Sequence, residues 1–228
     1  MFSIHYFQRK RRGGKNFSLE QIFLNLRNRL GTEYKVRHIE SPFVSSGIFK
    51  RIANVIDAFF RQGDINHVTG DINYVNLLQS KKRNVLTILD CGVLERVSGI
   101  KKKVIGLIWF KIPVTRATFV TVISEATKSH LLKVVNCKTE KIKVIYVPIS
   151  DEFKAVAKDF RSDKPRILQI GSAPNKNLKR LIEAVKDLPC ELSIIGEISK
   201  ENLALLEKNN IEFDNYFGLP FFRVIEEY

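Results

Sequence analysis

His67, Thr69, Gly70 and Asp71 are grouped where a short predicted strand at 64–68 ends. A histidine, a hydroxyl and a carboxylate at one strand end can bind the hydroxyl groups of a sugar or transfer a proton. His67 and Asp71 are therefore candidate catalytic residues, and Thr69 and Gly70 are candidate substrate contacts. The simpler alternative is a histidine in a local hydrogen bond and an aspartate that caps the next helix.

Two further predicted strands, at 84–89 and 119–123, also end in polar residues. Asp90 follows the first strand and is a third catalytic candidate, and Ser124 and Glu125 follow the second. Asp90 and Ser124 are also typical helix N-caps, and Glu125 suits either the first turn of a helix or a binding cleft. Ligands of parallel α/β sheets bind at the carboxyl ends of strands, so we expect these residues at one edge of a sheet.

A basic loop at 9–15 follows the first predicted strand and contains Gly13 and Gly14. Glycines let the backbone approach a ligand closely, and the helix predicted behind the loop offers free N–H groups. Phosphate is the expected ligand, although the loop lacks the G-x-G-x-x-G spacing of dinucleotide-binding loops. A solvated basic turn is the alternative.

A second strand, turn and helix begin at 166–170 and continue through Gly171, Asn175 and Lys176. Asn175 is expected to cap the helix, and Lys176 to lie in its first turn, where a cation opposes the helix dipole. A bound phosphate would reverse the sign of that interaction, so Lys176 is the favoured phosphate ligand. The turn Gly196–Glu197 ends the next strand and is expected to face the same cleft.

Motifs and composition exclude several protein classes. The chain has no Walker loop, no H-E-x-x-H, no G-x-S-x-G and no paired-cysteine motif, which argues against P-loop NTPases, zincins and α/β-hydrolases. Cys91, Cys137 and Cys190 are far apart and odd in number. No metal site is therefore expected, and a reducing cytoplasm is the expected compartment. Neither a membrane span of about 20 apolar residues nor a signal peptide is predicted.

The positive charge is concentrated in the first part of the chain. Residues 1–150 contain 26 Lys and Arg against 10 Asp and Glu, whereas residues 151–228 contain 12 and 14. Such a field favours an anionic partner: an acidic membrane surface, a phosphate-bearing substrate or a nucleic acid. Nucleic acid is the least favoured of these because only the charge supports it. The alternative is an ordinary solvated surface.

Strands alternate with helices along the chain, which predicts an α/β fold with two Rossmann-like domains. We expect the first domain at 1–150, a polar linker at 151–164 and the second domain at 165–228. The second domain is shorter than the roughly 100 to 150 residues that such a domain usually needs, and is therefore expected to be incomplete. One helix has a strongly amphipathic face made of Ile48, Ile52, Val55, Ile56, Phe59 and Phe60.

Several segments together resemble retaining, nucleotide-sugar-dependent glycosyltransferases of family four. The segments are Thr121–Lys128, Lys141–Pro148, Ile167–Gly171 with Asn175–Leu178, His67–Asp71 and Leu86–Cys91. The resemblance covers essentially the whole chain and implies the two-domain GT-B fold. It also implies that the first domain binds the acceptor and that the second binds the sugar nucleotide.

The resemblance implies roles for the candidate residues. Lys176 matches the basic residue that holds the donor diphosphate, and positive groups rather than an obligatory metal would stabilise the leaving group. The other donor-side candidates are Gly13, Gly14, Gly171, Asn177, Gly196 and Glu197. The acceptor-side candidates are Thr69, Gly70, Ser124 and Glu125. No cofactor is implied, since the nucleotide sugar is a substrate. The implied acceptor is a glycan or lipid-linked intermediate at the inner face of a membrane, which suits the basic first domain.

Three departures from the family pattern affect the expected activity. Leu89 stands where many members have a histidine, and Ser172 where many have an arginine. The family's donor-contacting glutamate pair would lie beyond Tyr228. The sequence therefore predicts a truncated glycosyltransferase, either the product of an interrupted gene or one part of a split enzyme that a second chain would complete. The alternative is a non-catalytic module that binds membranes or glycans. We expect little activity from this chain alone.

Overall fold

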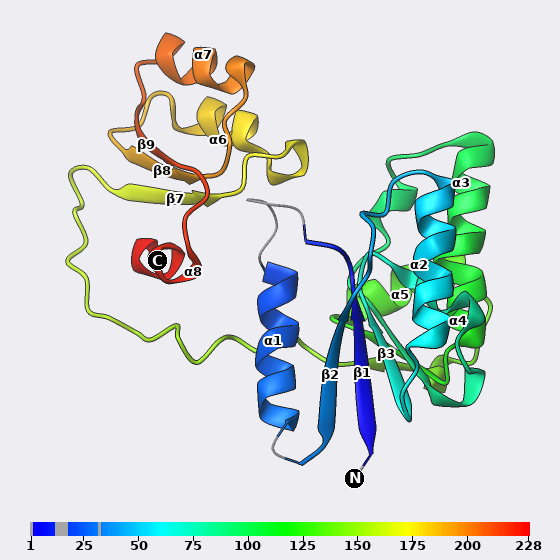
Figure 1. The fold of residues 1–228 in the computed structure, drawn as a ribbon. Helices are drawn as coiled ribbons and strands as arrows, with labels where there is room; N and C mark the ends of the chain where they lie inside the picture. Colours follow the sequence, from blue (N-terminus) through cyan, green and yellow to red (C-terminus); the bar gives the residue numbers. More distant parts are fainter. Residues whose placement is uncertain (1, 12–17, 32) are drawn as a thin grey trace. The chain divides into compact units, whose positions relative to one another are not determined.

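The computed structural model describes residues 2–11, 18–31 and 33–228 (Figure 1). The chain divides into two compact units, Met1–Pro148 and Ile149–Tyr228, and each has its own sheet. Residues 145–165, between the last strand of the first unit and the first strand of the second, form neither helix nor strand. Every helix in the described residues is too short or too polar to cross a bilayer.

The first unit is built on a parallel sheet of six strands in the order β2-β1-β3-β4-β5-β6. The strands are β1 (Ser3–Gln8), β2 (Lys35–Glu40), β3 (Ile65–Thr69), β4 (Asn84–Ile88), β5 (Phe119–Val122) and β6 (Ile142–Val144). Because β1 lies between β2 and β3, the direction of the strand order reverses at β1. The carboxyl ends of β1 and β3 therefore form the switch point at which such sheets bind ligands.

Helices cover both faces of this sheet (Figure 1). They are α1 (Ser18–Leu30), α2 (Ile48–Phe60), α3 (Gly99–Ile105), α4 (Ile112–Arg116) and α5 (Glu125–Val134). Right-handed crossovers that run in opposite directions from β1 place α1 on one face and the later helices on the other. Tyr6 and Phe23 pack in the core under α1, whereas Phe7, Val68 and Leu131 belong to the core on the opposite face.

A π segment interrupts the helical run between α3 and α4. This segment, η4 (Gly106–Lys111), joins α3 to α4. Pro113 has no N–H to donate to the carbonyl of Trp109, four residues earlier. Asn73 Nδ2 takes its place and donates to Trp109 O at 2.9 Å. The local distortion is thus satisfied by a side chain from the turn that follows β3.

The amphipathic face of α2 does not pack into the core. The residues that α2 buries are Asn54, Val55 and Ala58, so Val55 alone represents the predicted face. The other five predicted residues are exposed: Ile48, Ile52, Ile56, Phe59 and Phe60. α2 instead packs on the 3₁₀ turn η1 (Asn73–Leu78), where Asn54 Nδ2 donates to the Tyr74 hydroxyl at 3.1 Å. The helix is therefore held through its small and polar side.

The second unit is a parallel three-stranded sheet in the order β7-β8-β9. Its elements are β7 (Arg166–Ile170), α6 (Leu178–Val185), β8 (Glu191–Ile195), α7 (Lys200–Lys208), β9 (Glu212–Tyr216) and α8 (Phe221–Glu227). Both crossovers run in the same direction, so α6 and α7 cover the same face. Their apolar residues Leu178, Ile182 and Leu206 pack with Leu192 and Ile194 of the central strand.

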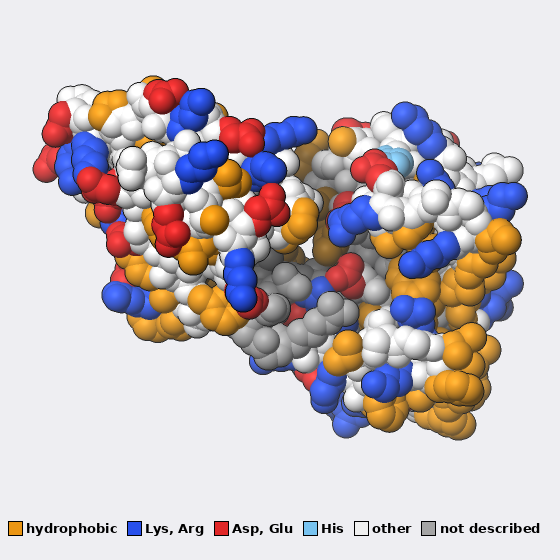
Figure 2. All heavy atoms as spheres, turned by 90° about the horizontal axis from the view of Figure 1, so that it is seen from above, with side chains coloured by type: hydrophobic (Ala, Val, Ile, Leu, Met, Phe, Trp, Pro, Cys, Tyr) orange, Lys and Arg blue, Asp and Glu red, His pale blue; other side chains and the backbone are white. Residues whose placement is uncertain are grey.

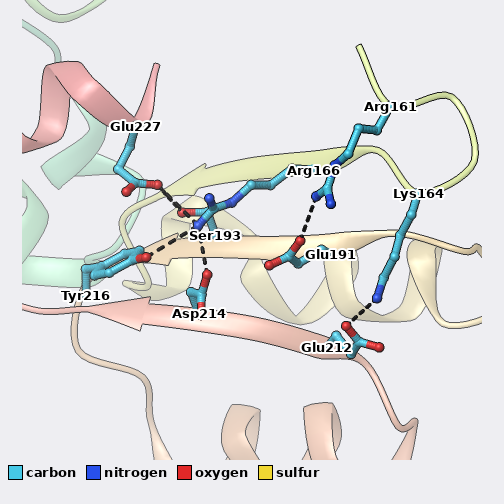
Figure 3. A network of polar contacts seen from close by, with 9 residues as sticks. All are labelled: Arg161, Lys164, Arg166, Glu191, Ser193, Glu212, Asp214, Tyr216 and Glu227. Atoms are coloured by element: carbon cyan, nitrogen blue, oxygen red, sulfur yellow. Dashed lines mark hydrogen bonds and ion pairs between the residues drawn. The ribbon is translucent and has the colours of Figure 1, made fainter. Parts of the chain in front are cut away.

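The other face of this sheet is ionic (Figure 3). Arg166 on β7 pairs with Asp214 on β9 at 2.8 Å and with Glu227 of α8 at 3.5 Å. Glu227 also accepts a hydrogen bond from Ser193 Oγ at 2.7 Å. Arg161 pairs with Glu191, and Lys164 pairs with Glu212. These contacts account for the charged and polar side chains on this face of the sheet.

Candidate substrate-binding sites

Arg9 joins the strand ends at the switch point of the first unit. Its Nη1 lies 2.5 Å from Asp71 Oδ2 after β3, and its Nε lies 3.0 Å from Glu20 Oε1 in α1. Burial acts to lower the pKa of Arg9, but Glu20 and Asp71 outweigh it and the pKa is raised. Only 14% of the Arg9 side chain is exposed, against 62% for Asp71. The carboxylate of Asp71 therefore remains accessible at the edge of the sheet.

The backbone turns sharply after β3. Gly70 and Asp71 have positive φ angles of 47° and 61°, in the left-handed region that glycine, asparagine and aspartate tolerate best. Trp109 Nε1 of the π segment donates to the carbonyl of Asp71 at 3.4 Å. Two consecutive residues in this conformation turn the chain directly after β3. Backbone strain of this kind is common at binding sites.

His67 and Asp71 have separate partners. The His67 ring lies among aromatic rings, with centroids 4.9 Å from Tyr6 and 5.8 Å from Phe23. His67 Nε2 is hydrogen-bonded to Thr87 Oγ1 at 2.7 Å. Burial lowers the pKa of His67 to about 4, so the ring is neutral at pH 7. His67 thus contributes to packing and to a hydrogen bond within the sheet rather than to a proton relay with Asp71.

Thr69 and Gly70 are buried at the same strand end. The Thr69 hydroxyl donates to the carbonyl of Phe7 at 3.0 Å, which ties β3 to β1. The Gly70 N–H donates to the carbonyl of Thr87 at 3.3 Å. Side chain and backbone at these positions fix the loop that carries Asp71, so both residues position the site rather than line it.

The ends of β4 and β5 are held together by α5. Ser124 is the N-cap of α5, as its residue type predicts, and its Oγ accepts from Thr127 N at 3.1 Å. Thr127 Oγ1 donates in turn to the carbonyl of Leu89 at 3.1 Å. Asp90 Oδ1 accepts from the Gly92 N–H at 2.8 Å, which forms a local turn. Asp90 and Glu125, which follows the cap, are exposed at the carboxyl edge.

The first strand of the second unit ends in a turn that needs glycine. Gly171 has a φ of 86°, and a Cβ at this position would lie 2.9 Å from Lys176 Cγ. The aliphatic stem of Lys176 therefore lies against the backbone at the end of β7. Residues Pro174–Lys176 form a 3₁₀ turn, so α6 begins at Leu178 with Asn177 as its N-cap. The predicted cap at Asn175 is therefore wrong, and so is the predicted position of Lys176 in the first turn of the helix, because Lys176 lies just before the N-cap.

The loops after β7 and β8 contact one another. Gly196 has a φ of 143°, and a Cβ there would lie 2.9 Å from Ser172 Oγ. Ser172 Oγ donates to the carbonyl of Glu197 at 2.5 Å. The structure therefore brings Gly171, Lys176, Gly196 and Glu197 to one edge of the sheet.

Two side-chain amides that the sequence did not single out brace these loops. Gln169 Nε2 donates to the carbonyls of Gly171 and Lys176, at 2.9 and 3.0 Å. Asn215 Nδ2 donates to the carbonyl of Gly196 at 2.8 Å. A side-chain amide at the next-to-last position of a strand was the available signal for both residues. Their hydrogen bonds hold the turns in place before any ligand arrives.

The start of α6 is positively charged. Lys179 and Arg180 follow Lys176, and the first turn of α6 contains no carboxylate. Lys179 Nζ pairs with Glu201 Oε1 of α7 at 3.2 Å. The N-cap Asn177, at a φ of 57°, makes no side-chain capping bond. A helix start with several cations favours an anion such as a diphosphate.

Gly13 and Gly14 lie outside the described residues. In the described part of the basic loop, Lys10 Nζ lies 3.2 Å from Glu40 Oε1 and Arg11 Nε lies 3.9 Å from Glu40 Oε2. Within residues 2–11, 18–31 and 33–228, no three His, Cys, Asp or Glu side chains are grouped so that they would hold a metal ion.

Several solved structures have the same arrangement of elements. HepE from Anabaena, in complex with UDP and glucose, matches with a TM-score of 0.65 and 16% identity over 95% of this chain and 70% of that chain. MnaA from S. aureus, in complex with UDP, matches with a TM-score of 0.54 and 14% identity over 100% and 70%. A TarM variant from S. aureus, with UDP, fondaparinux and α-GlcNAc-glycerol, matches with a TM-score of 0.53 and 15% identity over 72% and 37%.

No protein-family profile and no curated protein sequence matches this chain. At the identities found, the structural likeness concerns the fold. The chain has an α/β fold of the GT-B type, with two Rossmann-like units.

Proposed function

We propose that this chain is a glycosyltransferase that takes a sugar from a nucleotide donor, with UDP as the nucleotide. The likeness to HepE in complex with UDP and glucose, over 95% of this chain, is the observation that carries the proposal. The donor binds at the carboxyl edge of the β7–β9 sheet, and the acceptor at the carboxyl edge of the first unit. The nucleotide sugar is a substrate, and the proposal includes no cofactor.

Lys176 is the proposed diphosphate ligand. Its stem is fixed over Gly171, so the ammonium is carried at the start of α6, where the helix dipole is also positive. When the bond between sugar and diphosphate breaks, negative charge grows on the leaving group, and a preplaced cation stabilises that charge. Backbone groups of Asn177, Gly196 and Glu197 are the remaining proposed donor contacts.

The acceptor site is proposed at the exposed carboxylates of the first unit. Asp71, Asp90 and Glu125 can accept hydrogen bonds from sugar hydroxyl groups. The proposed acceptor is a glycan or a lipid-linked intermediate on the cytoplasmic side of a membrane, and the resemblance to family four favours retention at the anomeric carbon. β7 and β9 are the edge strands of the second sheet within the described residues, so a second chain that extends this sheet would pair with one of them.

Calorimetric titration with UDP and with GDP tests the donor site. Lys176→Ala is expected to weaken UDP binding by roughly 10 to 100-fold, because a charge-assisted hydrogen bond contributes about 1.5 to 3 kcal/mol. Lys186→Ala is the matched control, since Lys186 follows the other end of the same helix. Equal affinities of the two variants would contradict the assignment of Lys176, and no UDP binding by the folded chain would contradict the donor site itself.

One observation favours a second function, a binding module without transfer activity. Ser172 stands where many members of the family have an arginine, and its hydroxyl is engaged by the carbonyl of Glu197. Leu89, at the position of the family histidine, packs against the core under α1. A chain that binds glycan or membrane but neither binds UDP nor hydrolyses UDP-glucose would support this alternative over the transferase.

A further inference from the structure

α2 presents its largest side chains to solvent. Phe49 is 84% exposed and Phe60 is 78% exposed, although the helix is rich in apolar residues. The exposed apolar side chains of α2 are Ile48, Phe49, Ile52, Ile56, Phe59 and Phe60. A patch of this kind on a globular unit marks a site for another surface.

The neighbouring helical run continues the patch. Ile100, Val104 and Leu107 are exposed at helical spacing on α3 and the π segment. Together with the six α2 residues we call them the apolar surface. Arg51 of α2 lies over the ring of Trp109 in the π segment, 4.7 Å from its centroid, so the two helical segments are in contact. Figure 2 shows hydrophobic side chains gathered with lysines and arginines over this side of the first unit.

The rim of the apolar surface is basic. Lys101, Lys102 and Lys103 on α3 and Lys111 at the end of the π segment are exposed. In the described part of the chain none of these four lysines is paired with a carboxylate. Residues 98–116 contain no Asp or Glu, and the only acidic residue of α2, Asp57, pairs with Arg61 at 3.2 Å.

We infer that the apolar surface docks the first unit on an anionic lipid bilayer, with the phenylalanines of α2 in the headgroup boundary and the lysines of α3 among the lipid phosphates. Aromatic and branched aliphatic side chains beside unpaired lysines have the composition of an interfacial amphipathic helix. Each lysine near an anionic bilayer adds about a fivefold gain in binding. The inference deepens the proposed function, because it gives the surface that holds the protein beside a membrane-borne acceptor.

A second copy of the chain is a poorer occupant. A symmetric dimer brings the same patch of both protomers together, so the lysine rims would face each other. Like charges at an interface oppose association, whereas anionic lipid neutralises them.

Co-sedimentation of the full chain with vesicles tests the inference. Binding is expected to vesicles that mix phosphatidylglycerol with phosphatidylcholine and to be strongly weakened with phosphatidylcholine alone. The double variant Phe49→Ser/Phe60→Ser should bind the mixed vesicles at least roughly tenfold more weakly, because it removes two exposed aromatic side chains that docking would bury in the bilayer. Phe160→Ser, at an equally exposed phenylalanine of the second unit, is the matched control and should bind as the unchanged chain does.

A charge series gives an independent readout. Lys101→Gln/Lys102→Gln/Lys103→Gln should weaken binding to the mixed vesicles by roughly 100-fold. Lys133→Gln/Lys138→Gln/Lys208→Gln removes the same charge elsewhere and should have a much smaller effect.

Equal effects of the two triple variants, or binding unchanged by the double phenylalanine variant, would overturn the inference. A dimer that Phe49→Ser/Phe60→Ser dissociates, with no vesicle binding, would overturn it in favour of a second copy. UDP titration of the same variants, expected to be unchanged, separates this result from the donor site.

Discussion

Arg9 Nη1 lies 2.5 Å from Asp71 Oδ2, so one ion pair joins the carboxyl ends of β1 and β3. The same guanidinium bonds Glu20, which makes a group of one cation and two carboxylates. This ion-paired group of Arg9, Glu20 and Asp71 is therefore net negative, which favours sugar hydroxyls over a phosphate beside it. The phosphate-binding chemistry expected of this fold is better served by the cationic start of α6 in the second unit.

Loss of Arg9 should destabilise the first unit. Arg9→Met leaves the mostly buried carboxylate of Glu20 without its partner, and we expect the free energy of unfolding to fall by about 1 to 3 kcal/mol. Urea denaturation measures the change. Lys10→Met is the control, because Lys10 pairs with Glu40 at a more exposed site and should cost less than about 1 kcal/mol. A larger loss in Lys10→Met than in Arg9→Met would refute the structural role of Arg9.

His67 should make stability depend on pH in a defined window. Its pKa is about 4 in the folded protein, below the ordinary histidine pKa of 6.5, so the unfolded chain binds the proton more readily. The stability that His67 confers is present above pH 6.5 and is lost as the pH falls toward 4. Between pH 7 and pH 5, urea unfolding of the unchanged chain should therefore lose about 1 to 2 kcal/mol more than that of His67→Gln. His130→Gln, on the surface of α5, should behave as the unchanged chain does.

Gly171 and Lys176 should be energetically coupled. Gly171→Ala places a methyl group against the aliphatic stem of Lys176, at a backbone position with a positive φ. We expect the free energy of unfolding to fall by about 1 to 3 kcal/mol and UDP binding to weaken. In a Lys176→Ala background the side-chain contact is removed and only the backbone strain remains. The loss caused by Gly171→Ala should then be smaller, and a double-mutant cycle measures the difference. Strict additivity would show that Lys176 does not pack on Gly171.

Ser124 offers a test that separates capping from substrate binding. Ser124→Ala should reduce stability by about 1 kcal/mol, whereas Ser124→Gly should reduce it by only a few tenths, as expected of an N-cap. Thermal unfolding measures both values. If Ser124 also contacted the acceptor, the two variants would lose acceptor binding equally despite their different stabilities.

The first two strands of the second unit were predictable because β7 and β8 are short, mostly apolar runs bounded by turns. β7 occupies the predicted residues 166–170, and β8 ends at Ile195, directly before the predicted turn at Gly196–Glu197. The cap of α6 was not predictable in the same way. Pro174 starts a 3₁₀ turn that moves the helix start by two residues, and residue type alone does not distinguish Asn175 from Asn177.

Side-chain partners were the least predictable part of the site. Asp71 pairs with Arg9, which lies 62 positions away in sequence, and the pairing depends on the strand order of the sheet. The exposed face of α2 shows a related limit. The spacing of apolar residues indicates that Phe49 and Phe60 lie on a helix with an apolar side, but it does not indicate which surface that side contacts.

Among the described residues, the hydrophobic clusters of the first unit share no residue with the cluster of the second, since the former end at Val144 and the latter begins at Ile167. We expect each unit to unfold as its own cooperative unit, with its own enthalpy and its own melting temperature. In a calorimetric scan, a nucleotide that binds at the end of β7 would move one heat-absorption peak upward and leave the other in place. The peak that moves would therefore identify the unit that binds the ligand.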